Sequence, residues 1–382
     1  MRARVALVIT LAAMTCLGLL GSASAQTETP PPEPDNGSVV CSPGVYLNPP
    51  RDCLATGPSV YLVQLASLGL TIPAAPLPAQ AADPSLTSLP FHYFHVISPS
   101  PVAVGAAPGD EGGAQLLYPG FDYIGYQDRL DTGHGIFYML QNGGWVPGKG
   151  EQVGEISAFQ GLEFHSTPRN SFGWTFEDIP IQVAPGYGAA LTGQRLAPWS
   201  VVQIYDTQSV AGADWNMIGL DQWVEARKVA QVSVSTQSPD GSNASPRWID
   251  VNLAEQTLAV YDNNQLVFAT MIASGLDPFW TRPGLFQIQE KKPAETMRNN
   301  DPSDFYYLED VPWTMYFDGP RALHGAYWRT RFGYPQSHGC VNLSVGDAHW
   351  LFNWAHVGDW VYVHDPTGKT PTDPALYKGG AY

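Results

Sequence analysis

The sequence predicts a mainly β protein with more than one domain. Its 382 residues exceed a typical single domain, and 44% of them are hydrophobic, which is enough to bury more than one core. Only 14% are charged, whereas 38 glycines, 34 prolines and 12% aromatic residues favour short strands joined by many turns. We therefore expect several small β domains with few helices.

Residues 1–25 have the pattern of an export signal. Arg2 and Arg4 precede an apolar stretch over residues 5–20, and the small residues 23–25 form a cleavage site. A membrane anchor is the alternative, but a span needs about 20 apolar residues and this run is shorter. No later segment has the length and hydrophobicity of a span. The pattern predicts a secreted protein of the cell envelope, without an integral membrane span in the mature chain.

The charge of the chain makes nucleic acid an unexpected partner. Acidic residues number 35 against 19 basic ones, for a net charge of -16, and removal of the signal takes two of the arginines away. A protein this acidic repels the phosphate backbone.

The cysteines fall into two groups. Cys41 and Cys53 lie in a Pro- and Gly-rich stretch, and in an oxidising compartment we expect them to form a disulfide, with two free thiols as the alternative. Cys340 then remains an unpaired thiol in an exported protein. The alternative is that Cys340 is a buried structural cysteine that packs as a small hydrophobic residue. The histidines show no pair at metal-ligand spacing on a plausible helix, which disfavours a zinc amidase.

Residues 26–90 predict a linker and a small segment that carries the disulfide. The stretch QTETPPPEPDN at 26–36 is polar and Pro-rich, as extended linkers are. Further along, SVYLVQLASLGL at 59–70 predicts one amphipathic helix, and a second Pro- and Ala-rich linker follows it.

The sequence predicts that residues 91–237 form a β region of one or two small barrels. Short aromatic strands such as YIGYQDRL and GIFYML alternate with Gly turns in this region. The part at 199–229 resembles bacterial SH3-like modules, in which a W-x-x-I and a W-V hairpin close a small barrel. A generic antiparallel domain without a binding role fits it equally well.

The sequence predicts that residues 246–366 form the last domain and that residues 367–382 form a C-terminal tail. After the turn-rich stretch 238–246, period-two alternation predicts a three-stranded meander with a turn at Asn263-Asn264. Further strands are predicted at RPGLFQIQEKK and PWTMYFDG, and a final strand is predicted at DWVYVHD. Residues 344–355 open with the capping pattern Ser-Val-Gly-Asp and continue with helical spacing.

The residues that point to chemistry lie at 323–343. Two His-Gly dipeptides occur there, His324-Gly325 and His338-Gly339, and the second continues into Cys340. A thiolate is the nucleophilic form of cysteine, and a histidine in contact supplies both a base and a positive field. The glycine at 339 allows backbone N–H groups to approach a reacting carbonyl.

These residues resemble the L,D-transpeptidase (YkuD-type) catalytic family. SHGCVNL stands intact at 337–343, with His324 sixteen residues before Cys340, and TRPGLF at 281–286 is similar to the family's TPxGxF segment with one residue inserted. The resemblance covers about residues 247–365. It implies a mixed, sandwich-like β-sheet domain with one short helix after the nucleophile, and neither cofactor nor metal.

The resemblance also implies a mechanism and a partner, the stem peptides of peptidoglycan. Cys340 attacks the carbonyl between the third and fourth stem residues, His324 accepts the thiol proton, and the Gly325 carbonyl orients the His324 ring. The N–H groups of Gly339 and Cys340 form the oxyanion hole. An amine acceptor gives a 3→3 cross-link; water gives L,D-carboxypeptidase activity, and a protein acceptor gives wall-protein attachment.

Other residues near the motif have supporting or substrate-binding roles in this interpretation. His338 adjoins Gly339, and we expect it to hold the loop rather than act as the base; Ser337 is structural. Asn342 and Tyr316 are candidates for contact with the substrate. Trp313 and Trp328 could also line the pocket, although buried aromatic residues more often belong to a core.

Two further expectations concern the long segments around this domain. A non-catalytic wall-binding envelope protein is the alternative function, because the SH3-like region exceeds the catalytic part in length. The acidic segment Lys291 to Asp310 predicts a loop with little regular structure that covers the site as a lid.

Overall fold

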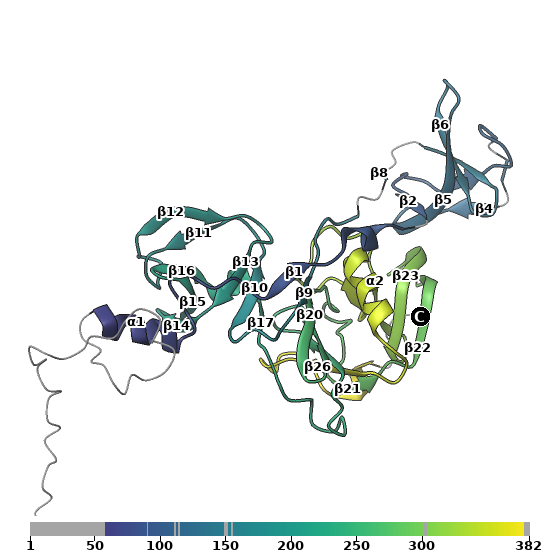
Figure 1. The fold of residues 1–382 in the computed structure, drawn as a ribbon. Helices are drawn as coiled ribbons and strands as arrows, with labels where there is room; N and C mark the ends of the chain where they lie inside the picture. The colour runs from purple at the N-terminus through teal and green to yellow at the C-terminus, as the bar shows by residue number, and fades with distance from the viewer. Residues whose placement is uncertain are drawn as a thin grey trace, which may run out of the picture. The chain divides into compact units, whose positions relative to one another are not determined.

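The computed structural model describes residues 58–89, 91–110, 112–113, 115–148, 152–153, 156–301 and 304–377. Strands dominate these residues (Figure 1), which confirms the predicted fold class. The α-helices of the described chain are α1 (Pro58–Ser67) and α2 (Val345–Trp354). The chain divides into two units, residues 1–63 and 64–382, and the strands of the described residues belong to the second.

The first sheet of the catalytic region is the predicted meander with strands added at both sides. Residues 248–271 form three antiparallel strands, and Asn263 and Asn264 turn between two of them at φ of 51° and 59°. Asparagine tolerates this left-handed conformation, which two-residue hairpins require. The seven strands in spatial order are β1 (Ala79–Ala81), β9 (Leu162–Phe164), β20 (Gln265–Met271), β19 (Thr257–Asp262), β18 (Trp248–Asn252), β26 (Trp360–His364) and β21 (Gly284–Gln287).

The second sheet holds the strands that carry the motif. Its main path runs from β25 (Val341–Leu343) through β24 (Arg321–Gly325) and β23 (Tyr306–Asp318) to β5 (Phe121–Asp131), β2 (His92–His95) and β8 (Gln152–Val153). Strand β23 also pairs with β22 (Glu290–Asn299), and β5 pairs with β6 (Ile136–Leu140), which pairs with β7 (Trp145–Pro147). Residues 306–308 pair in parallel with residues 121–123. Strands from two distant parts of the chain therefore share one sheet.

Helix α2 packs against the site strands from within the core. Ser344 caps it, because its side chain accepts a hydrogen bond from the N–H of Asp347. Ala348 and Leu351 are fully buried in one cluster with residues of both sheets, including Phe268 and Val341. This core fixes where β24 and β25 lie.

The segment predicted as an unstructured lid is a β-hairpin, so that prediction is wrong. Strands β22 and β23 pair antiparallel from Glu290↔Tyr316 to Asn299↔Tyr306. Among the described strands, β22 pairs with β23 alone, and it is rich in charged residues and contains Pro293. Edge strands tolerate proline and charge because one side forms no ladder. A covering role of this hairpin remains a proposal.

The remaining strands form smaller antiparallel sheets. A three-stranded sheet contains β13 (Val201–Ile204), β10 (Ser171–Thr175) and β17 (Val229–Val232); a two-stranded one contains β3 (Val102–Val104) and β4 (Gln115–Leu117). A five-stranded sheet contains β12 (Leu191–Leu196), β11 (Ile179–Gln182), β16 (Gln222–Glu225), β15 (Ala213–Gly219) and β14 (Asp206–Val210). The SH3-like character of this region stays a prediction.

Several predictions fall on residues outside those described. They include the signal at 1–25, the linker at 26–36, and the disulfide of Cys41 with Cys53. Among the described helices, neither has the length and apolar character needed to cross a bilayer.

Candidate active site

The register of two parallel strands brings the motif residues together. In the pairing of β24 with β25, Leu323 lies opposite Val341 and His324 opposite Asn342. Paired residues of neighbouring strands point to the same face, as do residues two apart along one strand. Cys340 directly precedes β25, and the Ala322 N–H of β24 donates to its Sγ at 3.5 Å, so the thiol lies beside the strand that carries His324.

His324 is held as a neutral imidazole. Its Nε2 lies 2.9 Å from Nδ2 of Asn342, an amide nitrogen that only donates, so Nε2 accepts this hydrogen bond. The proton is then on Nδ1, which donates to the Gly325 carbonyl at 3.1 Å. The His324 side chain is buried, and burial lowers its pKa to about 4 despite the favourable Gly325 hydrogen bond. The ring is therefore uncharged at neutral pH.

Arg329 fixes the orientation of the Asn342 amide. Its Nε donates to Oδ1 of Asn342 at 2.6 Å, and its Nη2 donates to the Gln336 carbonyl at 2.5 Å. Because a guanidinium has no acceptor, Oδ1 must face Arg329 and Nδ2 must face His324. Arg329 lies outside the motif and was not predicted from the sequence. Burial lowers the pKa of Arg329 to about 10, so it stays a cation at neutral pH.

The Cys340 thiol is buried and contacts the backbone of β24 and the turn before it. Its Sγ accepts a hydrogen bond from the Ala322 N–H at 3.5 Å, and the S–H is directed at the Pro320 carbonyl at 3.8 Å. Burial raises the pKa of Cys340, whereas the Ala322 N–H and the charge of Arg321 oppose this rise. Among the hydrogen bonds of the described residues, none joins Cys340 to His324. Catalytic hydrogen bonds often tighten only when substrate binds.

Hydrogen bonds brace the loop before Cys340 from two sides. Ser337 Oγ donates to the Cys340 carbonyl at 2.5 Å and accepts from the Gly339 N–H at 3.1 Å. Thr281 Oγ1 donates to the Gly339 carbonyl at 2.9 Å, and Gly339 has a φ of +115°, which favours glycine. The structural role expected of Ser337 agrees with these contacts. An oxyanion bound by the Gly339 N–H would have to replace the Ser337 hydrogen bond.

His338 connects this loop to the β22–β23 hairpin. Its Nε2 lies 2.8 Å from Oδ1 of Asp304, at the hairpin turn. Its ring centroid lies 4.8 Å from that of Phe279 and 5.0 Å from that of Tyr306. These contacts join the loop to its neighbours; the role of His338 in holding the loop stays a prediction.

The aromatic candidates divide between the site and the core. Tyr316 pairs across strands with Ala322, whose N–H donates to Cys340 Sγ, and the pKa of Tyr316 is raised to about 12, first by burial and then by the charges of Glu295 and Cys340. The Trp328 ring centroid is 5.8 Å from that of His324. Trp313 instead stacks on His349 at 3.9 Å and packs into the core of α2. The structure therefore brings Tyr316 and Trp328 to the site, and Trp313 to the core.

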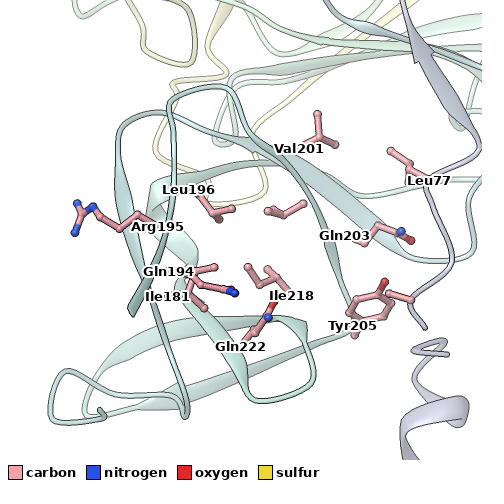
Figure 2. A pocket seen from close by; sticks show the side chains of 12 residues that line it. Leu77, Ile181, Gln194, Arg195, Leu196, Val201, Gln203, Tyr205, Ile218 and Gln222 are labelled. Atoms are coloured by element: carbon pink, nitrogen blue, oxygen red, sulfur yellow. The ribbon is translucent and has the colours of Figure 1, made fainter. Parts of the chain in front are cut away.

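A cavity of about 680 Å³ lies away from these residues. Leu77 and the strand residues Leu196 and Val201 border it (Figure 2). Arg195 extends away from its centre and pairs with Asp178. None of the motif residues lines this cavity. In the described part of the chain, no group of three or more His, Cys, Asp or Glu side chains is placed to hold a metal ion.

The fold and the site define a class of protein. A buried thiol lies against the strand that carries a neutral imidazole, and the second nitrogen of this imidazole donates to a backbone carbonyl. Cysteine enzymes that form acyl intermediates require a nucleophile, a nearby base and a third group that orients the base. The site holds candidates for all three of these groups in Cys340, His324 and the Gly325 carbonyl.

Comparison with known proteins gives the family of this domain. Residues 246–363 match the family model of the L,D-transpeptidase catalytic domain. A putative L,D-transpeptidase YciB of Bacillus subtilis (strain 168) is 25% identical over 144 residues, which cover 34% of this chain and 73% of the relative. The chain therefore carries an L,D-transpeptidase catalytic domain.

Solved structures with similarity to the chain have the same description. An L,D-transpeptidase from Stackebrandtia nassauensis is 26% identical, with a TM-score of 0.27, over 34% of this chain and 58% of that one. The catalytic domain of the E. faecium L,D-transpeptidase is 25% identical, with a TM-score of 0.29, over 31% of this chain and 96% of that one.

Proposed function

We propose that this protein is a peptidoglycan L,D-transpeptidase that forms 3→3 cross-links through a thioester on Cys340. The observation that carries the proposal is the contact of Cys340 with β24, the strand that carries His324, within the residues that match the catalytic domain. Peptidoglycan lies outside the cytoplasmic membrane, so this function requires export, which the predicted signal at 1–25 would provide.

In the acylation step, Cys340 Sγ attacks the carbonyl between the third and fourth residues of a donor stem. The S–C bond forms and the C–N bond breaks, while His324 Nε2 takes the thiol proton and passes it to the departing D-alanine amine. Nε2 must first exchange its Asn342 donor for the thiol. Because the pKa of His324 is about 4, its imidazole is present in the base form throughout the neutral range.

In the second step, the side-chain amine of a neighbouring stem attacks the thioester carbonyl. The C–N bond forms, the C–S bond breaks, and the Cys340 thiol is regenerated. Neutral His324 is again available to accept the proton that the amine loses. Water in place of the amine gives the L,D-carboxypeptidase reaction at the same site.

The test is intact mass spectrometry of the full chain after incubation with a donor tetrapeptide. The expected adduct is the donor minus D-alanine, located on Cys340. Cys340→Ala should abolish the adduct, and His324→Ala should slow its formation by at least about 100-fold, the usual contribution of a general base. His134→Ala, which changes an exposed histidine, is the matched control and should react as the parent does.

The products separate transpeptidation from hydrolysis and from a non-catalytic role. Addition of an acceptor stem should consume the adduct and give a 3→3 linked dimer; release of tripeptide alone would instead make the protein an L,D-carboxypeptidase. A parent protein that forms no adduct would contradict the proposal and favour a non-catalytic wall-binding role. A Cys340→Ala variant that still forms the adduct would contradict the role of Cys340 as the nucleophile.

A further inference from the structure

A buried arginine lies against the nucleophile loop and is not part of the motif. The Arg321 side chain is 5% exposed, and its Nη1 lies 3.3 Å from Oδ2 of Asp318. Its Nη2 donates to the Tyr377 carbonyl at 3.4 Å, and the Tyr377 ring centroid is 5.0 Å from its Cζ. Its Nε is buried without a hydrogen-bond partner among the described residues. Buried guanidinium groups normally satisfy their donors, so this exception requires an explanation.

The backbone places this guanidinium next to the peptide that precedes the nucleophile. A Cβ on Gly339 would lie 3.1 Å from Arg321 Nε, so that nitrogen contacts the open side of Gly339. The following residue of β24, Ala322, donates its N–H to Cys340 Sγ. One short stretch of β24 therefore presents both a cation and a hydrogen-bond donor to the Cys340 region.

The charges around Arg321 leave a net positive group beside the thiol. Asp318 accepts hydrogen bonds from Arg282, whose Nε lies 2.9 Å away, as well as from Arg321. Two guanidinium groups thus share one carboxylate. His324 is neutral, so an imidazolium does not supply the positive field that a thiolate needs. The other ionisable groups that influence Cys340 or the tyrosines beside it are Tyr306, Tyr316, Glu290, Glu295 and Asp304.

We propose that Arg321 is a positioning residue that stabilises the Cys340 thiolate as it forms, when His324 Nε2 takes the thiol proton. Asp318 holds the guanidinium, and Tyr377 from the C-terminal segment excludes water from it. A charge acts more strongly where water is excluded, because the effective dielectric constant is lower. The proposal deepens the proposed function, since it rests on Cys340 as the nucleophile.

The test is the pH dependence of Cys340 alkylation in the full chain. Iodoacetamide modification is followed by mass spectrometry of the peptide that contains Cys340, from pH 6 to pH 10, so the other cysteines do not interfere. Arg321→Met should move the midpoint upward by about one pH unit, which lowers the thiolate fraction at pH 7 about tenfold. Arg321→Lys keeps the charge, so its midpoint should stay close to that of the parent.

A second variant gives a shift of the opposite sign. Asp318→Asn removes the carboxylate that neutralises Arg321 and should move the midpoint downward. Loss of packing alone would not produce opposite shifts in two neighbouring variants. If Arg321→Met fails to fold by circular dichroism, Asp318→Asn and Arg321→Lys decide the question.

The outcomes separate this proposal from the proposed function. A folded Arg321→Met protein with the midpoint of the parent overturns the role of Arg321, and so do equal shifts in Arg321→Met and Asp318→Asn. Midpoints that move as stated in a protein that forms no adduct with donor tetrapeptide support the role of Arg321 and contradict transpeptidation.

Discussion

Asp347 offers a quantitative test of the core that holds the site strands. It is fully buried, accepts a hydrogen bond from the Gly161 N–H at 2.8 Å, and accepts another from Thr270 Oγ1 at 2.5 Å. Burial outweighs these hydrogen bonds and raises the pKa of Asp347 from 3.8 to about 6. The folded protein therefore binds this proton more tightly than the unfolded chain does.

The sign of the pH dependence follows from this difference. Between pH 3.8 and pH 6, the folded state holds more protons than the unfolded state, so the free energy of unfolding falls as pH rises. A shift of about two pKa units corresponds to about 3 kcal/mol, of which about 2 kcal/mol is lost between pH 4.5 and pH 7.5. The stabilisation is fully present only below the unfolded pKa.

The perturbation is Asp347→Asn, which keeps the shape but cannot ionise. The Gly161 N–H can still donate to the new carbonyl oxygen, and the amide can donate to Thr270 Oγ1. Relative to the parent, the free energy of unfolding of the variant should rise by about 2 kcal/mol between pH 4.5 and pH 7.5. The assay is urea denaturation of both proteins at several pH values, and the difference cancels the other titrating groups.

The reasoning would be refuted if the difference in free energy of unfolding between the two proteins did not change with pH. It would also be refuted if the parent became more stable relative to the variant as pH rises. Either result would mean that Asp347 is ionised in the folded state as readily as in the unfolded chain.

Three further predictions concern the hydrogen bonds around the site. Arg329→Met removes the donor that orients Asn342 and should slow Cys340 acylation roughly tenfold, the effect of losing about 1.4 kcal/mol from a charged hydrogen bond; an unchanged rate would contradict the orienting role. Asp304→Ala breaks the contact with His338 and should speed amide hydrogen exchange at the hairpin turn, measured by mass spectrometry. Unaltered exchange would show that this contact does not hold the hairpin. Gln256→Ala should lower the free energy of unfolding by about 3 kcal/mol in urea, because it unpairs the buried N–H of Ser274 and the Leu253 carbonyl; a loss below about 1 kcal/mol would argue against this.

Local patterns predicted the elements whose neighbours are close in sequence. The meander at 248–271 follows from period-two alternation and the Asn263-Asn264 turn, and α2 follows from its Ser344 cap and its spacing. Strand β22 was not predicted because it is a charged edge strand that contains Pro293. Its sequence therefore lacks the alternation of a half-buried strand. Its pairing comes from the long partner strand β23.

Chemistry predicted the nucleophile and base, but not their buried support. Cys340 and His324 are identified by residue type and spacing, because few other residues perform those roles. Arg321 and Arg329 look like ordinary surface arginines in the sequence, and only the folded chain shows that both are buried. Tyr316 was a candidate from its position, whereas the contacts of His338 needed the hairpin turn to be placed.

The shared sheet has a consequence for the smallest chain that can fold as an enzyme. Residues 121–123 satisfy the backbone of residues 306–308, and the Tyr93 ring stacks on Tyr327 at 3.5 Å, three residues after His324. A chain cut at residue 246 would leave this stretch of β23 as an open strand edge and uncover an aromatic surface, both of which favour self-association. The autonomous unit therefore begins well upstream of the residues that match the catalytic family, and the segment before that match contributes to the scaffold of the active site.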